Sequence, residues 1–179
     1  MPAMLVFADL HLREENADVI FQEVLPWVRR EAQNRACHTV ACLGDFWQVR
    51  HRLPVRLLNA VLDLLAEWTR QGLKVILLAG NHDQVDVSGR NALEVLAGVP
   101  GVAVYSYPTT DEWGCWVPYR KDVSELVGVL RELPAGLPLY GHFGVQSAWM
   151  TGAFRDSDGV PLDELAKFRY SMLGHYHRP

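Results

Sequence analysis

Acidic, amide and imidazole side chains recur directly after apolar segments of this sequence. The pattern occurs at Asp9/His11, Asp45, Asn81/His82/Asp83, His142 and His175/His177. Five of the seven histidines lie in these endings, which histidines scattered over a surface would not do. Each motif alone is common in loops, and it is their joint order that indicates a functional site.

The residue types in these endings favour metal chemistry. Carboxylate and imidazole ligands without thiolates suit Mn, Fe or Zn. So many candidate ligands are too many for one ion and suit two ions that share a bridging carboxylate. Two ions about 3.5–4 Å apart can activate a water and stabilise in-line displacement at phosphorus. Because side chains alternate along a strand, Asp9 and His11 are expected to point the same way, as are His175 and His177.

Alternating strands and helices are expected to position the first three endings. The apolar runs Met4–Ala8, Thr39–Leu43 and Lys74–Ala79 read as buried strands. Between them, residues 17–36 have helical spacing with a kink or late start at Pro26, and residues 55–71 form a helix after Pro54. This order predicts a parallel sheet with right-handed crossovers, whose carboxyl ends are the usual place for a ligand.

The second half of the chain has shorter elements. Helices are expected at Asn91–Ala97, Asp122–Leu133 (with Asp122 as N-cap) and Pro161–Phe168. The segments Val102–Tyr105 and Cys115–Pro118 are expected in a second, partly antiparallel sheet, because they lie close together with turn residues between them. The strands Leu137–Tyr140 and Tyr170–Leu173 deliver His142 and His175/His177.

Composition limits the class of protein. A chain of 179 residues, 49% hydrophobic, fits one domain over residues 1–179. The net charge of −4 argues against binding nucleic acid by bulk attraction alone, unless the acidic residues hold metal ions. The odd number of cysteines (Cys37, Cys42 and Cys115) indicates free thiols and a cytoplasmic protein. With no signal peptide and no apolar run of about 20 residues, no membrane association is expected.

The ordered set of motifs resembles the calcineurin-like metallophosphoesterase superfamily. The motifs are Asp-x-His, Gly-Asp, Gly-Asn-His-Asp, Gly-His and Gly-His-x-His, from Asp9 to His177. The resemblance implies an α/β fold, a four-layer αββα sandwich of two mixed sheets. It also implies that Asp9, His11 and His177 bind one metal ion, that Asn81, His142 and His175 bind the other, and that Asp45 bridges them.

The resemblance further implies that His82 is catalytic. It would face the substrate, stabilising the transition state or protonating the leaving oxygen, while the two ions, most simply Mn, activate a hydroxide nucleophile. Two features depart from the usual pattern. Gln48 stands where an ionisable partner for the motif histidine is common, with His51 a possible substitute, and the chain stops two residues after His177 where the family usually continues. For Asp83 we expect a role in orienting its loop.

Within the superfamily, the chain is most similar to nuclease subunits of the SbcD type and their tailed-phage relatives. Asp-Leu-His, Gly-Asp-Phe-Trp and the terminal Gly-His-Tyr-His-Arg-Pro carry this similarity. It implies a DNA exo- or endonuclease, a partner ATPase of the SbcC type and a homodimer. Two alternatives stay open: a small-molecule phosphoesterase acting on nucleotides, and a non-catalytic interaction module on the same fold.

Two groups of residues outside the motifs have more than one interpretation. Trp149, Met150 and Phe154 in the loop 144–160 would stack on bases, form a dimer contact or fold back onto the core. Arg50, Arg52 and Arg120 would contact phosphate or remain solvated charges.

Overall fold

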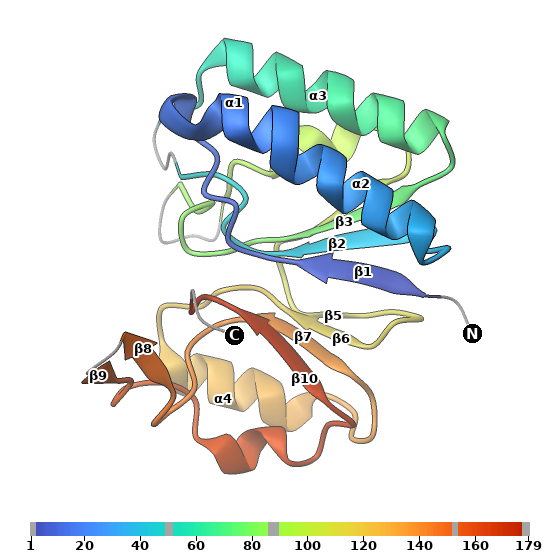
Figure 1. Ribbon diagram of the computed structural model, residues 1–179. Coiled ribbons are helices and arrows are strands. Elements are labelled where there is room, and N and C mark those ends of the chain that lie inside the picture. The colour runs from blue at the N-terminus through green and yellow to red at the C-terminus, as the bar shows by residue number, and fades with distance from the viewer. Residues whose placement is uncertain (1–2, 49–51, 86–89, 152–153, 177–179) are drawn as a thin grey trace.

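Two β-sheets face each other, and helices cover the outer side of each (Figure 1). The structure is a computed structural model that describes residues 3–48, 52–85, 90–151 and 154–176. The order of layers is helices, first sheet, second sheet, helices, which confirms the expected αββα sandwich. No helix in the described ranges is long and apolar enough to cross a membrane.

The first sheet contains four parallel strands in the order of the chain. They are β1 (Met4–Phe7), β2 (Thr39–Leu43), β3 (Lys74–Leu78) and β4 (Val102–Tyr105). The placement of Val102–Tyr105 in the second sheet was therefore wrong, because β4 pairs in parallel with β3. The 3₁₀ turn η3 (Glu94–Gly98) serves as the crossover, and its Leu96 packs into the same apolar cluster as the helices on that face.

The helices of this face begin and end near their predicted positions. The first helical run consists of η1 (Glu14–Asn16), α1 (Ala17–Val19), a π-helical turn η2 (Ile20–Val24) and α2 (Leu25–Asn34). The π turn ends just before Pro26, which has no backbone N–H to donate, and it accommodates the proline inside a continuous helix. The second helix, α3 (Val55–Arg70), follows Pro54 as predicted.

The second sheet is mixed, as expected, whereas the described strands of the first are all parallel. Its order is β10 (Ser171–Gly174), β7 (Leu139–His142), β6 (Cys115–Val117) and β5 (Thr109–Thr110), and only β5 runs antiparallel to its neighbour. Its outer face carries α4 (Val123–Glu132) and the 3₁₀ turn η4 (Leu162–Leu165). Asp122 caps α4 as predicted, accepting from Ser124 N–H at 2.8 Å. The expected loop contains a small antiparallel pair, β8 (Trp149–Thr151) and β9 (Phe154–Arg155).

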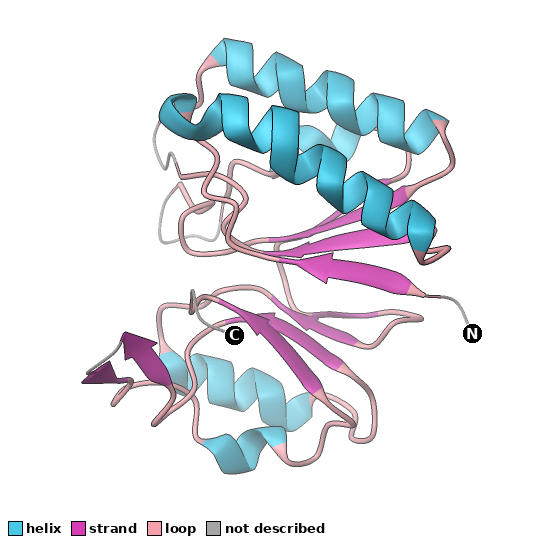
Figure 2. Cartoon of the chain, in the orientation of Figure 1, coloured by secondary structure: helices cyan, strands magenta, loops and turns pink. Residues whose placement is uncertain are grey.

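Three apolar clusters correspond to the three contacts between layers. The largest joins the helices to the first sheet, and another joins α4 to the second sheet. The middle cluster lies between the sheets, where the Trp116 and Tyr140 rings stack with centroids 4.4 Å apart. This packing brings the carboxyl ends of β1, β2, β3, β7 and β10 to one edge of the sandwich (Figure 2).

Candidate metal centre

The segment after β1 runs beside the segment after β2. Asp9 N–H donates to Gly44 O at 3.1 Å, and His11 N–H donates to Asp45 O at 2.8 Å. Asp9, His11 and Asp45 have positive φ angles of 56°, 48° and 52°. Residues other than glycine seldom adopt this left-handed backbone conformation. Such conformations persist where surrounding contacts fix them, and they gather at functional sites.

The same geometry corrects one expectation. Strand alternation was expected to point the side chains of Asp9 and His11 the same way. However, β1 ends at Phe7, and both residues have a left-handed backbone conformation. They nevertheless lie together, with His11 Nε2 4.0 Å from Asp9 Oδ1. His175 likewise follows the end of β10, with φ 111°. His177 lies outside the described residues, so its place in the site stays a prediction.

Asp45 lies at the middle of the cluster and is only 2% exposed. Its Oδ1 accepts from His82 N–H at 2.8 Å, while its Oδ2 is 3.3 Å from His142 Nε2 and 3.8 Å from His11 Nε2. Burial raises the pKa of Asp45, but the hydrogen bond and charge of His142, together with His82 N–H, leave that pKa below its ordinary value. Oδ2 of this carboxylate therefore lies between the imidazoles of His142 and His11, while Oδ1 holds the backbone of His82.

His142 is fully buried and its tautomer is fixed by the first sheet. Its Nδ1 lies 2.6 Å from Leu43 O, and because a carbonyl only accepts, Nδ1 carries the proton. Its Nε2 faces Asp45 Oδ2 at 3.3 Å and Asn81 Oδ1 at 3.1 Å. Burial alone would lower the pKa of His142. The hydrogen bond and charge of Asp45 outweigh this effect, so the pKa of His142 is above its ordinary value.

Asn81 and His175 complete this side of the cluster. Asn81 Oδ1 is 3.1 Å from both His142 Nε2 and His175 Nδ1. The backbone N–H of His175 donates to the Asp9 carboxylate, with distances of 3.2 and 3.3 Å to its two oxygens. Burial and the charge of His142 lower the pKa of His175, which favours the neutral imidazole that a metal ion requires.

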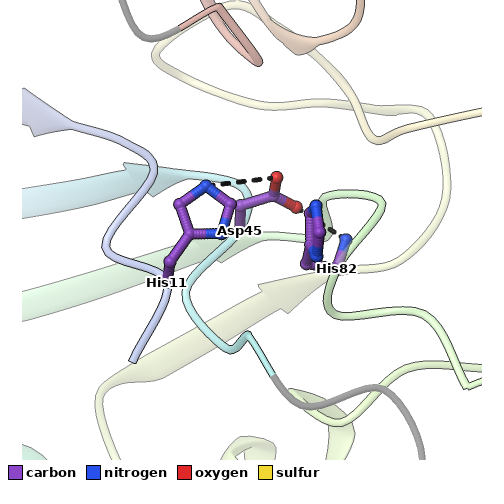
Figure 3. Close-up of side chains that lie close together, drawn as sticks. All are labelled: His11, Asp45 and His82. Carbon is purple, nitrogen blue, oxygen red and sulfur yellow. Dashed lines mark hydrogen bonds and ion pairs between the residues drawn. The ribbon is translucent and has the colours of Figure 1, made fainter. Parts of the chain in front are cut away.

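His82 lies beside Asp45 and His11 (Figure 3). Its ring is edge-on to that of His11, with centroids 4.9 Å apart. Donor atoms of His11, Asp45 and His82 lie within 4.8 Å of one another, as do those of Asp9, Asp45 and His142. The structure thus holds two overlapping groups of ligand atoms that share Asp45. His51, the alternative partner for His82, lies outside the described residues.

Asp83 links the loop after β3 to the loop after β2. It is completely buried, and its two carboxylate oxygens accept from Trp47 N–H at 2.8 Å and from Gly80 N–H at 2.9 Å. Burial raises the pKa of this carboxyl to about 7, against the lowering effect of those two hydrogen bonds. A side chain at Gly80 would meet Asp45, with a Cβ only 2.3 Å from Asp45 Oδ1. Asp83 and Gly80 together hold the loop against the Asp45 carboxylate.

One residue beside the site was not found from the sequence. Tyr119 follows the end of β6, which is parallel to β7 and so ends at the same edge of the sandwich. Its ring centroid is 5.9 Å from that of His175 and 6.5 Å from that of His142. A search for metal ligands does not select an uncharged phenol. The signal that could have found Tyr119 is that it follows the end of a buried strand, as the predicted ligands do.

The donor set fits divalent cations. When His142 is neutral, as metal binding requires, its proton is at Nδ1 and the lone pair of Nε2 points toward Asp45 Oδ2 and Asn81 Oδ1. Three acceptor atoms then face one another, and a cation between them satisfies all three. Carboxylate, amide and imidazole donors suit Mn, Fe or Zn better than a soft thiolate-binding ion.

The chain belongs to the calcineurin-like phosphoesterase family, whose model matches residues 3–178. Members of this family are phosphoesterases that depend on two metal ions. A search of curated proteins found no match. Among solved structures, the crystal structure of the Pseudomonas putida nuclease MPE is similar at a TM-score of 0.46 and 18% identity, over 87% of this chain and 71% of that chain.

Proposed function

We propose that this protein is a phosphodiesterase that uses two divalent ions, preferably Mn, and that its substrate is DNA, as in nucleases of the SbcD type. The observation that carries the proposal is the gathering of six predicted ligands, five of them around the carboxylate of the sixth, Asp45. These ligands come from five strand ends of both sheets: Asp9, His11, Asp45, Asn81, His142 and His175. Metal-dependent phosphoester hydrolysis is the shared chemistry of the family.

The roles proposed for these residues are those that the family resemblance implies. Asp9 and His11, with His177, would hold one ion, and Asn81, His142 and His175 the other, with Asp45 between them. Bound ions would activate a water and neutralise charge on the phosphoryl oxygens. The imidazole of His82 would donate its proton to the leaving oxygen. The hydrogen bond from the His82 backbone N–H to Asp45 fixes the position of this residue beside the site.

The charges around the site support a diester over a monoester. In the described part of the chain, the ion pairs of the site join only histidines to aspartates. Arg120 is occupied elsewhere, within 3.6 Å of Glu125 and beside the Tyr107 ring. A phosphate diester carries one negative charge fewer than a monoester dianion, so it needs less compensating positive charge from the protein.

A substrate panel tests the proposal. Purified protein with added Mn is expected to hydrolyse bis(p-nitrophenyl) phosphate and linear DNA faster than p-nitrophenyl phosphate, and EDTA is expected to stop both reactions. Faster turnover of the monoester contradicts the diesterase assignment. A preferred nucleotide without DNA cleavage indicates the small-molecule alternative. Absence of bound metal by elemental analysis supports the non-catalytic alternative.

The role of His82 is tested by a substitution that preserves its backbone hydrogen bond. His82→Asn is expected to lower kcat by roughly 10²–10⁴-fold, the range for loss of a general acid, while both metal ions stay bound. His38→Asn is the control, because His38 is an exposed histidine before β2, away from the site. Full turnover by His82→Asn contradicts the catalytic role, and loss of metal shows that His82 is a ligand.

Two partners belong to the same proposal. A nuclease of the SbcD type works with an ATPase of the SbcC type and as a homodimer, so we propose both associations for this chain. Size-exclusion chromatography with light scattering tests the dimer, and co-purification with an SbcC-type subunit tests the other.

A further inference from the structure

The backbone of Tyr119 is fixed on both sides of the residue. Its N–H donates to Ala79 O at 2.9 Å, at the end of β3. Its carbonyl accepts from Gln84 Nε2 at 3.0 Å and from Arg120 Nη1 at 3.3 Å. These bonds connect the end of β6 to the loop that carries Asn81 and His82, and they hold the phenol at the edge of the metal centre.

The ring of Tyr119 borders the side of the centre formed by His142 and His175. It lies 5.9 Å from the His175 ring at an interplanar angle of 36°, and 6.5 Å from the His142 ring at 71°. The side chain is half-buried, so it packs against a predicted ligand and is also reachable from solvent. A group bound to an ion that these histidines would hold would therefore come close to the Tyr119 ring.

The hydroxyl of Tyr119 differs from those of other tyrosines in the core. Tyr176, whose ring is 5.2 Å from that of His175, donates its hydroxyl to Asp156, and Tyr105 donates to Asp111 at 2.8 Å. The hydroxyl of Tyr119 makes no hydrogen bond to any residue that the structure describes. A half-buried phenol usually has a polar partner.

We propose that the Tyr119 hydroxyl donates a hydrogen bond to a non-bridging oxygen of the substrate phosphoryl group. This inference rests on the proposed function, and it adds a substrate contact that is neither a metal ligand nor charged. A neutral donor suits a diester, because it stabilises negative charge that develops on the phosphoryl oxygens without requiring a dianion.

The test compares two hydroxyl deletions beside the same histidine. Tyr119→Phe keeps the ring and is expected to lower kcat/KM for bis(p-nitrophenyl) phosphate by about 10-fold, the usual effect of losing a hydrogen bond to a charged group. It is also expected to weaken binding of inorganic phosphate to the Mn-loaded protein, by calorimetry, by a similar factor. Tyr176→Phe is the matched control, expected to stay within about twofold in both measurements, because its hydroxyl already bonds Asp156. Bound Mn should equal that of the wild type in both variants.

The outcomes separate this inference from the proposed function. If wild-type protein binds Mn and phosphate but hydrolyses no ester, and Tyr119→Phe still weakens phosphate binding, the proposed function fails and the contact stands. If the wild type is active and Tyr119→Phe matches it in both measurements, the contact is wrong and the function stands. Loss of Mn in Tyr119→Phe would show that the residue only positions His175, which also overturns the inference.

Discussion

The two sheets contribute to the metal centre in different ways. The first sheet supplies Asp9, His11, Asp45 and Asn81 on loops that bond to one another, through Asp9 to Gly44, His11 to Asp45 and His82 to Asp45. The second sheet supplies His142 and His175, and both are anchored on the first sheet, by Leu43 O and the Asp9 carboxylate. The half from the first sheet is therefore organised within itself, while the other half depends on how the sheets dock.

The docking surface is apolar and tightly packed. Leu43 and Leu78 of the first sheet meet Trp116 and Tyr140 of the second in a cluster whose members are at most 5% exposed. Packing of this kind fixes the distance between sheets, because interiors have little free volume to absorb a shift. The comparison predicts that changes at the junction will harm the site more than changes of similar chemistry elsewhere.

The largest expected effect comes from placing a methyl group at the junction. Gly44 has φ +88°, and a Cβ there would lie 2.1 Å from His142 Nδ1. Gly44→Ala is expected to lower the free energy of unfolding by about 3 kcal/mol or more, from backbone strain together with the clash. It is also expected to weaken Mn binding about 100-fold by displacing His142. Urea denaturation and calorimetry with Mn measure the two effects.

Gly72→Ala is the matched control for this experiment. Gly72 has a similar φ of +85°, but a Cβ there meets nothing within 4 Å. Its substitution is expected to cost only the strain, about 1–2 kcal/mol, and to leave Mn binding unchanged. Equal loss of Mn affinity in both variants would show that the junction at Gly44 has no special role.

A smaller effect on the free energy of unfolding is expected from the titration of Asp83, which lies in the half of the site that the first sheet supplies. Its carboxyl has a pKa of about 7 in the folded protein against 3.8 in a model peptide. Between these values the folded state keeps a proton that the unfolded state has lost, so the free energy of unfolding decreases as the pH rises. This group alone contributes a decrease of about 2 kcal/mol between pH 5 and pH 7 in metal-free protein.

Asp83→Asn checks this pH dependence. The amide does not titrate, so the difference between pH 5 and pH 7, measured by urea denaturation in EDTA, should shrink by about 2 kcal/mol. The variant should also be less stable at pH 5 by about 1–3 kcal/mol, because the amide NH₂ cannot accept from a backbone N–H. An unchanged pH dependence would mean that Asp83 is ionised throughout this range.

The smallest effect is expected far from the junction, on the outer layer of the second sheet. Asp122 caps α4 by accepting from Ser124 N–H at 2.8 Å and Glu125 N–H at 3.3 Å. Asp122→Ala should lower the free energy of unfolding by about 1 kcal/mol, with Mn affinity and turnover unaltered. A drop in Mn affinity would show that the second-sheet half is sensitive to its outer layer and not only to docking.

The sequence predicted the parts of the fold that depend on local pattern. Apolar runs that end at a glycine and a polar residue located the loops after β2 and β3 and the carboxyl end of β7, since buried strands and their stops are encoded nearby. The cap at Asp122 and the start of α3 after Pro54 follow from the same local chemistry. The expected roles of the seven ligands remain predictions, although the structure brings six of them together.

Other features depend on contacts between distant segments and could not be predicted. The membership of β4 in the first sheet rests on parallel pairing with β3, a segment distant from it in the chain. The left-handed conformations of Asp9 and His11 depend on backbone hydrogen bonds to the loop after β2. Phe46 and Trp47 looked like part of a nuclease signature, and the structure shows both fully buried in the core on the helical side.

The two anchors of the second-sheet half also determine when the site can form. Leu43 O and His142 are 99 residues apart in the chain, and the Asp9 carboxylate and the His175 N–H are 166 apart. Contacts over such separations close late in folding, because the loop entropy must be overcome first. During synthesis the first-sheet loops can fold around Asp45 long before His175 leaves the ribosome. A nascent chain would therefore hold the four ligands of the first-sheet half, Asp9, His11, Asp45 and Asn81, well before His142 and His175 join them.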